Sequence, residues 1–226
     1  MTTGDIEKLS IDDTIDIGDI LLRYSGVPLS KARKVAIMLH GRGASADSFI
    51  GISKAMNTSN VCFIAPNAER GTWYPQSFLA PVRQNEPWLT MSLNIIRRIV
   101  EELTARGFRT EQLYFIGFSQ GACLSLEYVT RNAAKYGGVI AFTGGLIGES
   151  VNPTTYSGNF DGTTVFIGTS DVDTHVPLER VNETEILMSE MGATVLKSVY
   201  QGMTHTINSE ELEMAGVILR SKMVLG

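Results

Sequence analysis

The 226-residue chain is long enough to bury a substantial core, and 43% of its residues are hydrophobic. Its net charge of −5, with no cluster of Lys and Arg, excludes a phosphate-binding nucleic-acid surface. No run of about 18 apolar residues predicts a membrane span, and the acidic first residues do not resemble a secretory signal, so we expect a cytoplasmic protein forming one domain over residues 1–226.

Six short apolar runs predict strands. Most of them are continuous rather than alternating, which is typical of strands that are covered on both faces. In chain order the expected strands are residues 34–39, 60–65, 112–118, 137–142, 163–168 and 194–200.

Segments between and after these runs predict helices. The apolar residues of segment 88–108 fall on one helical face, and Gly107 is expected to end that helix. The segment after Ser119 is apolar on nearly all sides, which predicts a buried helix. Asn208 and Glu211 have the spacing of a capping box at the start of the last helix. Alternating strands and helices predict an α/β fold, with a mostly parallel sheet and helices on both faces.

The residues that directly follow the predicted strands carry the candidate chemistry. Ligands of open parallel sheets bind beyond the carboxyl ends of the strands. We therefore expect one site at this edge of the sheet. Its candidates are all three histidines of the chain, one serine and two aspartates: His40, Ser119, Asp171, Asp173, His175 and His205.

Ser119 lies in a G-x-S-x-G pattern between Gly117 and Gly121. The glycines permit a sharp strand-to-helix turn that strains the serine, because side chains at both positions would collide with neighbouring elements. Backbone N–H groups and the helix dipole there favour developing negative charge. A serine that only caps the helix is the alternative. The preceding strand, the apolar helix and the chain order serine, acid, histidine favour a nucleophile.

His205 is the candidate general base, because it follows a strand in a loop without an apolar pattern. A histidine that only bonds a backbone carbonyl is the alternative. Asp171 and Asp173 are both candidates for the acid, and either could be a turn residue. His175 is expected to pack in its loop or to lie at a pocket rim. A zinc site of His40, His175 and His205 is disfavoured because no paired metal-ligand spacing supports it. No metal and no cofactor are expected.

The sequence resembles the phospholipase/carboxylesterase family of α/β-hydrolases, which includes acyl-protein thioesterases and small bacterial carboxylesterases. The resemblance extends from about Val35 to the C-terminus. It implies an α/β-hydrolase fold. Four segments carry it together: LHGRGAS (39–45), GFSQGA (117–122), DTHVP (173–177) and GMTHTI (202–207).

The resemblance also implies roles for individual residues. Ser119 would be the nucleophile and His205 the general base, with an aspartate orienting the histidine. The backbone N–H groups of Arg42 and Gln120 would form the oxyanion hole. Because backbone groups are the donors, replacing the Arg42 or Gln120 side chain is expected to have little effect.

The acid loop departs from the usual family pattern H-G-x-x-D-x-x-V-P. Ile167 replaces the histidine, and the loop is two residues longer. Counting from Gly168 selects Asp171, whereas counting back from Val176–Pro177 selects Asp173. We expect Asp173, because the Val-Pro pair that opens the next helix is the stiffer anchor.

Segment 66–88 is expected to control substrate choice, because it shows no strand or helix period and contains four prolines. Long ordered loops of this kind are usually functional. Trp73, Tyr74 and Phe78 are candidates to line an acyl pocket, with coverage of one edge of the core as the alternative. Segment 144–162 is too short for a separate lid domain, so we expect an open site.

Three functions remain. The first, which we expect, is a serine carboxylesterase that acts on small or short-acyl esters. The second is a thioesterase or lysophospholipase that acts on acylated proteins or lipids. The third is a non-catalytic receptor, against which the presence of Ser119, Asp173 and His205 argues. The sequence leaves open whether two copies form a homodimer.

Overall fold

The computed structural model describes residues 13–221. Its centre is a seven-stranded sheet with the strand order β1-β3-β2-β4-β5-β6-β7. β1 runs antiparallel to β3, and the other neighbouring strands are parallel. The strands are β1 (Leu22–Gly26), β2 (Lys34–Leu39), β3 (Val61–Pro66), β4 (Leu113–Phe118), β5 (Gly138–Phe142), β6 (Thr164–Ser170) and β7 (Thr194–Tyr200).

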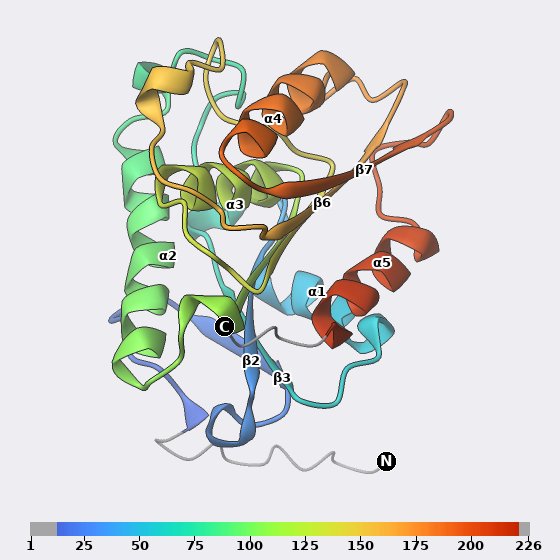
Figure 1. Ribbon diagram of the computed structural model, residues 1–226. Helices are drawn as coiled ribbons and strands as arrows, with labels where there is room; N and C mark the ends of the chain where they lie inside the picture. The colour runs from blue at the N-terminus through green and yellow to red at the C-terminus, as the bar shows by residue number, and fades with distance from the viewer. Residues whose placement is uncertain (1–12, 222–226) are drawn as a thin grey trace, which may run out of the picture.

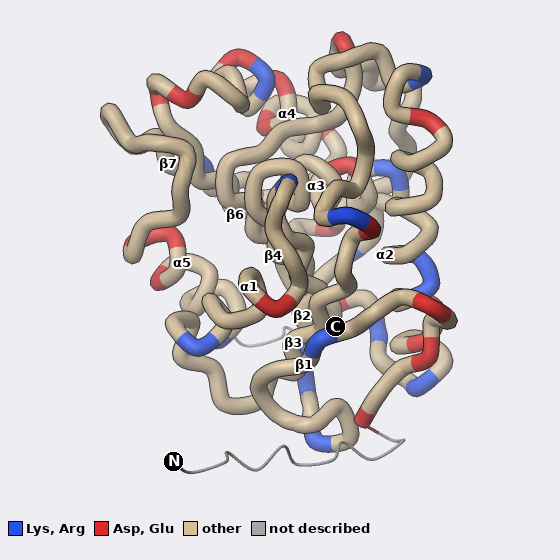
Figure 2. The backbone as a smooth tube through the Cα atoms, turned by 180° about the vertical axis from the view of Figure 1, so that it is seen from behind, with Lys and Arg blue, Asp and Glu red and all other residues tan. Residues whose placement is uncertain are grey.

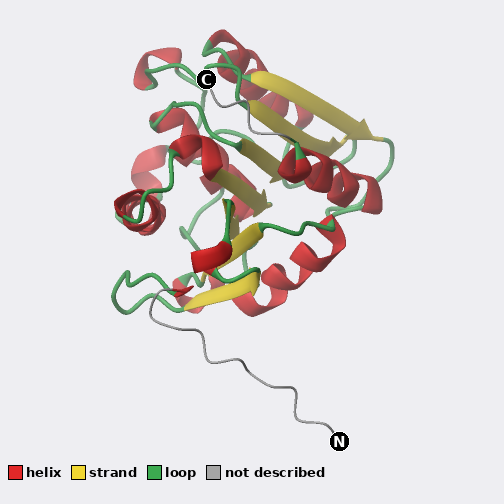
Figure 3. Cartoon of the chain, turned by 60° about the horizontal axis from the view of Figure 1, so that its bottom comes forward, coloured by secondary structure: helices red, strands yellow, loops and turns green. Residues whose placement is uncertain are grey.

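Helices cover both faces of the sheet (Figure 1). α2, α3 and α4 lie on one face, and α1 and α5 lie on the other. The strands follow one another as a twisted sheet between these two layers (Figure 3). The α-helices of the described residues are α1 (Ala46–Ile50), α2 (Trp88–Ala105), α3 (Gln120–Arg131), α4 (Leu178–Glu190) and α5 (Ser209–Arg220).

Alternate residues of the central strands feed two apolar layers. Ile37 and Phe115 pack on the side of α2 and α3, whereas Met38 and Ile116 pack on the side of α1 and α5. All four side chains are fully buried. Because both faces are covered, the strands need apolar residues at successive positions, which explains their continuous apolar runs.

The six strands expected from the sequence are present, and the mostly parallel sheet is confirmed. β6 continues to Ser170, beyond its expected end at Gly168. β1 was not expected. It is a partly exposed edge strand of mixed polarity, so it lacks the apolar run that marks the central strands.

Charged residues of both signs are interspersed along the chain rather than gathered by sign (Figure 2). Among residues 13–221, no helix is long and apolar enough to cross a membrane.

The parallel register brings the chemistry-bearing loops to one edge of the sheet. Leu39 of β2 pairs with Gly117 of β4, and Ser170 of β6 pairs with Tyr200 of β7. The loops that follow these four strands contain His40, Ser119, Asp173 and His205.

Candidate active site

Ser119 lies on a strained turn between β4 and α3. Its φ of 53° and ψ of −116° are unusual for a residue with a side chain and cost about 1–3 kcal/mol. A β-carbon at Gly117 would lie 2.3 Å from the Gly121 carbonyl oxygen, and one at Gly121 would lie 2.0 Å from the Leu39 carbonyl oxygen. The close approach of these backbones confirms why both flanking positions are glycine.

Hydrogen bonds join Ser119, His205 and Asp173 in a chain. Nε2 of His205 lies 2.8 Å from Oγ of Ser119. Nδ1 of the same ring lies 2.6 Å from Oδ2 of Asp173. A carboxylate can only accept, so Nδ1 carries the proton and Nε2 offers its lone pair to the serine hydroxyl. The histidine is thereby set to take a proton from the serine.

The Asp173 carboxylate is fully buried and accepts three hydrogen bonds, one from His205 and two from its own loop. Its Oδ1 accepts the backbone N–H groups of His175 at 2.7 Å and Val176 at 2.9 Å. Burial raises the pKa of this carboxyl, but the hydrogen bonds from His205 and the two amides outweigh burial and bring the pKa below its ordinary value. Asp173 therefore remains ionised beside His205.

Asp171, the other candidate acid, has a different partner. Its Oδ1 accepts the backbone N–H of Gly202 at 2.7 Å. This bond ties the loop after β6 to the loop after β7, and the residue is exposed. The geometry therefore brings Asp173, and not Asp171, to the imidazole of His205.

The backbone N–H groups of Arg42 and Gln120 are free of hydrogen bonds within the described part of the chain. Gln120 is the first residue of α3, where N–H groups have no partner inside the helix. Arg42 lies in the loop directly after β2. Both donors are thus available to an anionic oxygen, and the positive end of the α3 dipole adds to the attraction.

A cavity of about 430 Å³ opens beside Ser119. Tyr74 and Phe78 line it, although little of either side chain is exposed. The two residues therefore cover the core and also face the cavity. For Tyr74 and Phe78, pocket lining and core coverage are thus both true. The other lining residues are Arg42, Pro75, Gln76, Ser77, Leu79, Gln120, Cys123, Thr174, His175 and Val176.

Trp73 does not line this cavity, which corrects its expected place in the acyl pocket. Its ring is buried, and its Nε1 donates to the His40 carbonyl oxygen at 2.8 Å. Its own carbonyl oxygen accepts from the Ser92 hydroxyl at 2.6 Å. Trp73 therefore anchors the loop of residues 66–88 to the core.

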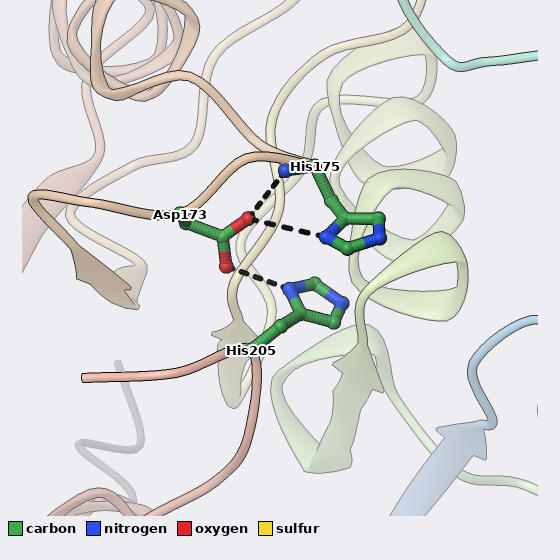
Figure 4. A group of neighbouring side chains, drawn as sticks. All are labelled: Asp173, His175 and His205. Atoms are coloured by element: carbon green, nitrogen blue, oxygen red, sulfur yellow. Dashed lines mark hydrogen bonds and ion pairs between the residues drawn. The ribbon is translucent and has the colours of Figure 1, made fainter.

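His175 lies at the rim of the cavity and also contacts the His205 ring. The two rings lie 4.7 Å apart between centroids, tilted by 32° (Figure 4). The ligand atoms of Asp173, His175 and His205 all lie within 4.8 Å of one another. His40 is not part of this cluster, so the structure does not bring together the three histidines whose zinc site the sequence disfavoured.

Comparison with known proteins agrees with this geometry. The phospholipase/carboxylesterase family model matches residues 27–221. The chain belongs to the phospholipase/carboxylesterase family. Its fold is the α/β-hydrolase fold, and it is a hydrolase of the esterase and thioesterase family.

Individual relatives support the assignment. The crystal structure of a phospholipase/carboxylesterase from Dyadobacter fermentans is 46% identical, with a TM-score of 0.86 over 89% of this chain and 97% of that chain. Acyl-protein thioesterase 1 of Candida albicans is 26% identical over 81% of this chain and 89% of its own. The Bacillus cereus carboxylesterase, at 17% identity and a TM-score of 0.71 over 88% and 93% of the two chains, shares the fold.

In this family member, the side chains of Arg42 and Gln120 hold the pocket loop. The Arg42 guanidinium donates to the carbonyl oxygens of residues 74–76 at 2.7–2.9 Å. Gln120 accepts from the Trp73 backbone N–H at 3.0 Å and donates to the Tyr74 carbonyl oxygen at 2.7 Å. We therefore no longer expect these side chains to be replaceable with little effect, because their loss would release the pocket loop.

Replacement of Gln120 by alanine is expected to lower the free energy of unfolding by about 2 kcal/mol, because it leaves the buried Trp73 N–H without its acceptor. Gln84→Ala is the matched control, since Gln84 is exposed and its change should stay within about 0.5 kcal/mol. Urea unfolding of both variants measures the difference. Equal losses in the two variants would show that the Gln120 contacts do not hold the loop.

Sequence reasoning missed several residues that face the cavity. Cys123 follows Ser119 by one helical turn on α3, and this spacing could have placed it on the same face. Thr174 and Val176 flank His175 in the acid loop. Sequence reasoning also missed Asn85, which is not a lining residue: it is fully buried and bonds the backbone of Gln76 and Ser77, and no local pattern marks it.

His40 is a structural residue of the loop after β2. Its Nε2 accepts the Ala68 backbone N–H at 3.1 Å, and its Nδ1 donates to the Gly41 carbonyl oxygen at 2.8 Å. Burial lowers the pKa of this imidazole, although the bond to Gly41 opposes the change. These two bonds require a neutral ring, and they leave His40 outside the hydrogen-bonded chain of Ser119, His205 and Asp173.

Glu211 fixes the far end of the loop that carries His205. Its Oε2 accepts the Asn208 backbone N–H at 2.8 Å, and its own N–H donates to the Asn208 side chain at 2.9 Å. This is the capping box expected from the sequence. A β-carbon at Gly168 would lie 2.0 Å from Oε1 of Glu211, so the buried carboxyl packs directly on β6.

Burial raises the pKa of Glu211 to about 7 from an ordinary 4.5; the Asn208 backbone bond opposes this change, and Glu210 adds to it. The folded state therefore holds the proton more tightly than the unfolded state. The contribution of Glu211 to the free energy of unfolding is therefore present in full below its unfolded-state pKa of 4.5. It is lost as the pH rises through about 7. The expected loss from about pH 4 to about pH 8 is about 3 kcal/mol, and Glu211→Gln should lack it. Urea unfolding of both proteins across this range measures it, and a pH-independent difference between them would contradict it.

Proposed function

We propose that this hydrolase is a serine carboxylesterase that cleaves esters of small or short-acyl substrates through an acyl-enzyme. The observation that carries the proposal is the hydrogen-bonded chain from Ser119 through His205 to Asp173. The strained turn at Ser119 supports it, because such a turn presents the serine oxygen at the end of a sheet in serine hydrolases of this fold.

The proposed reaction begins when Oγ of Ser119 attacks the ester carbonyl carbon and gives its proton to Nε2 of His205. Asp173 holds the ring and stabilises its charged form. The ring then gives the proton to the leaving alcohol as the ester C–O bond breaks. In the second half, His205 takes a proton from water, which attacks the acyl-enzyme and releases the acid and free Ser119.

The oxyanion of both tetrahedral intermediates would lie between the backbone N–H groups of Arg42 and Gln120. Their freedom from other hydrogen bonds supports this role. A donor of this kind contributes about 3 kcal/mol to transition-state stabilisation. The side chains act separately, by holding the pocket loop, so their replacement tests loop position rather than the oxyanion donors.

The cavity beside Ser119 supports a preference for short acyl groups. Tyr74 and Phe78 are proposed to contact the acyl group, and Trp73 to support them from beneath the loop. Its volume of about 430 Å³ is toward the lower end of the range found for small-molecule sites, which is about 300–1,000 Å³. Polar residues such as Gln76, Ser77 and Thr174 share the lining, which disfavours a long alkyl chain.

A thioesterase or lysophospholipase is the second candidate, because acyl-protein thioesterases are among the relatives. The same serine, histidine and aspartate would serve a thioester. A panel of p-nitrophenyl esters and matched thioesters of increasing acyl length separates the candidates by kcat/KM. The proposal predicts the highest values for acetate and butyrate esters. Faster hydrolysis of the palmitate ester, or of the matched thioesters, would overturn the proposed preference.

Ser119→Ala is the control for every substrate in this panel. Its activity should fall to the background rate, because no other nucleophile reaches the acyl carbon in the proposed reaction. Full activity of this variant would contradict a serine mechanism. A wild-type protein inactive on the whole panel and unreactive toward a fluorophosphonate would instead favour the receptor.

A further inference from the structure

Asp173, His175 and His205 form a cluster, and the proposed hydrolysis gives no role to one of its members, His175. Only Asp173 and His205 take part in the proton-transfer chain. His175 adds a second imidazole against the His205 ring, and its side chain is 69% exposed. Its Nδ1 lies 3.9 Å from Oδ1 of Asp173, which is too long for a hydrogen bond.

These three side chains offer two imidazole nitrogens and one carboxylate oxygen. This is the donor set of many zinc sites, in which the ligand bonds are about 2.0–2.2 Å long. In a tetrahedral site, ligand atoms with such bonds lie about 3.3 Å apart. The three ligand atoms here are already within 4.8 Å of one another, and the His175 ring is exposed, with only a long 3.4 Å contact between its Nδ1 and the Thr174 hydroxyl to give up. Small side-chain rotations therefore suffice to form the site.

We propose that Zn²⁺, or another divalent transition-metal ion, binds to Asp173, His175 and His205 and reversibly inhibits the enzyme. His175 is the residue that makes this site, because it converts an aspartate–histidine pair into a three-ligand cluster. The inhibitory consequence rests on the proposed function, whereas the binding site does not. This site differs from the disfavoured zinc site of the three histidines, because His40 lies elsewhere and Asp173 supplies the third ligand.

A bound ion stops hydrolysis whichever nitrogen of His205 it takes. Nε2 is the atom that faces Ser119, so an ion on its lone pair removes the general base. Nδ1 is the atom that faces Asp173, so an ion there replaces the proton and breaks the bond that orients the ring. Mg²⁺ and Ca²⁺ prefer oxygen ligands and are not expected to bind this nitrogen-rich set.

The first arm of the test measures inhibition of p-nitrophenyl acetate hydrolysis in protein without a histidine tag. Each variant is compared with its own rate without metal. Zn²⁺ at about 0.1 mM should reduce the wild-type rate at least about tenfold, Mg²⁺ should not, and EDTA should restore the rate. His175→Gln should require at least about tenfold more Zn²⁺, because it loses a ligand. Asp171→Asn is the matched control in the same loop and should be inhibited like the wild type.

The second arm measures binding without activity. Calorimetric titration of Ser119→Ala with Zn²⁺ should give one ion per chain, and the added His175→Ala change should weaken binding at least about tenfold. This arm stands even if the proposed esterase activity fails. Equal Zn²⁺ inhibition of the wild type and His175→Gln, or equal zinc affinity in the two Ser119→Ala proteins, would overturn the inference.

Discussion

Replacement of His205 by alanine is expected to lower kcat/KM for p-nitrophenyl acetate by about 10⁵-fold to 10⁶-fold. Without the ring, no side chain of residues 13–221 within hydrogen-bond distance of Ser119 takes its proton during attack. Loss of one member of such a unit costs nearly as much as loss of all of it, and the residual rate comes from the oxyanion donors and binding. Steady-state kinetics measure the effect.

The His205 variant must also be shown to be folded. The side chain is 21% exposed and lies in a loop, so its removal should leave the urea unfolding midpoint close to that of the wild type. A folded variant that keeps more than about a tenth of the wild-type activity would exclude His205 as the general base.

Asp173→Asn is expected to reduce kcat by about 10⁴-fold, with Asp171→Asn close to the wild type. The amide that replaces the carboxylate can present a donor to Nδ1 of His205. The ring then adopts the tautomer with its proton on Nε2, which cannot accept the proton of Ser119. Asp171 makes no such contact, because its carboxylate bonds the Gly202 backbone.

The two aspartate variants form their own matched pair, since each replaces one carboxylate oxygen by an NH₂ group in the same loop. Measured kcat values for both, together with unfolding midpoints, separate catalysis from loop stability. A larger loss in Asp171→Asn than in Asp173→Asn would move the acid to Asp171 and contradict the hydrogen-bonded geometry.

The strands with a continuous apolar run and the helices with an apolar face could be predicted from the sequence, and so could the edge of the sheet where their loops meet. Ser119 was marked by its glycines, whose close backbone contacts give the physical reason for the pattern. The acid could be narrowed to two residues only, because the acid loop is longer than the usual pattern and the two ways of counting disagree. The hydrogen bond to His205 distinguishes them, and it joins residues 32 positions apart.

The remaining features depend on contacts that no local pattern encodes. Gln120 bonds the backbone N–H of Trp73 across 47 positions, and the Trp73 ring that was expected in the pocket is buried. Arg42 bonds the carbonyl oxygen of Pro75 across 33 positions. Periodicity reports which face of an element is apolar, but it does not report which distant loop covers that face. The edge strand β1 was missed for a related reason, since its partial exposure removes the apolar signal.

The central claim is that Ser119 is the nucleophile of a serine hydrolase, and covalent labelling tests it most directly. The protein is incubated with a fluorophosphonate, and the modified residue is located by peptide mass spectrometry. The account predicts one label per chain, on Ser119, with labelling lost in Ser119→Ala and strongly slowed in folded His205→Ala. A label on another residue, or equal labelling of Ser119→Ala, would contradict it.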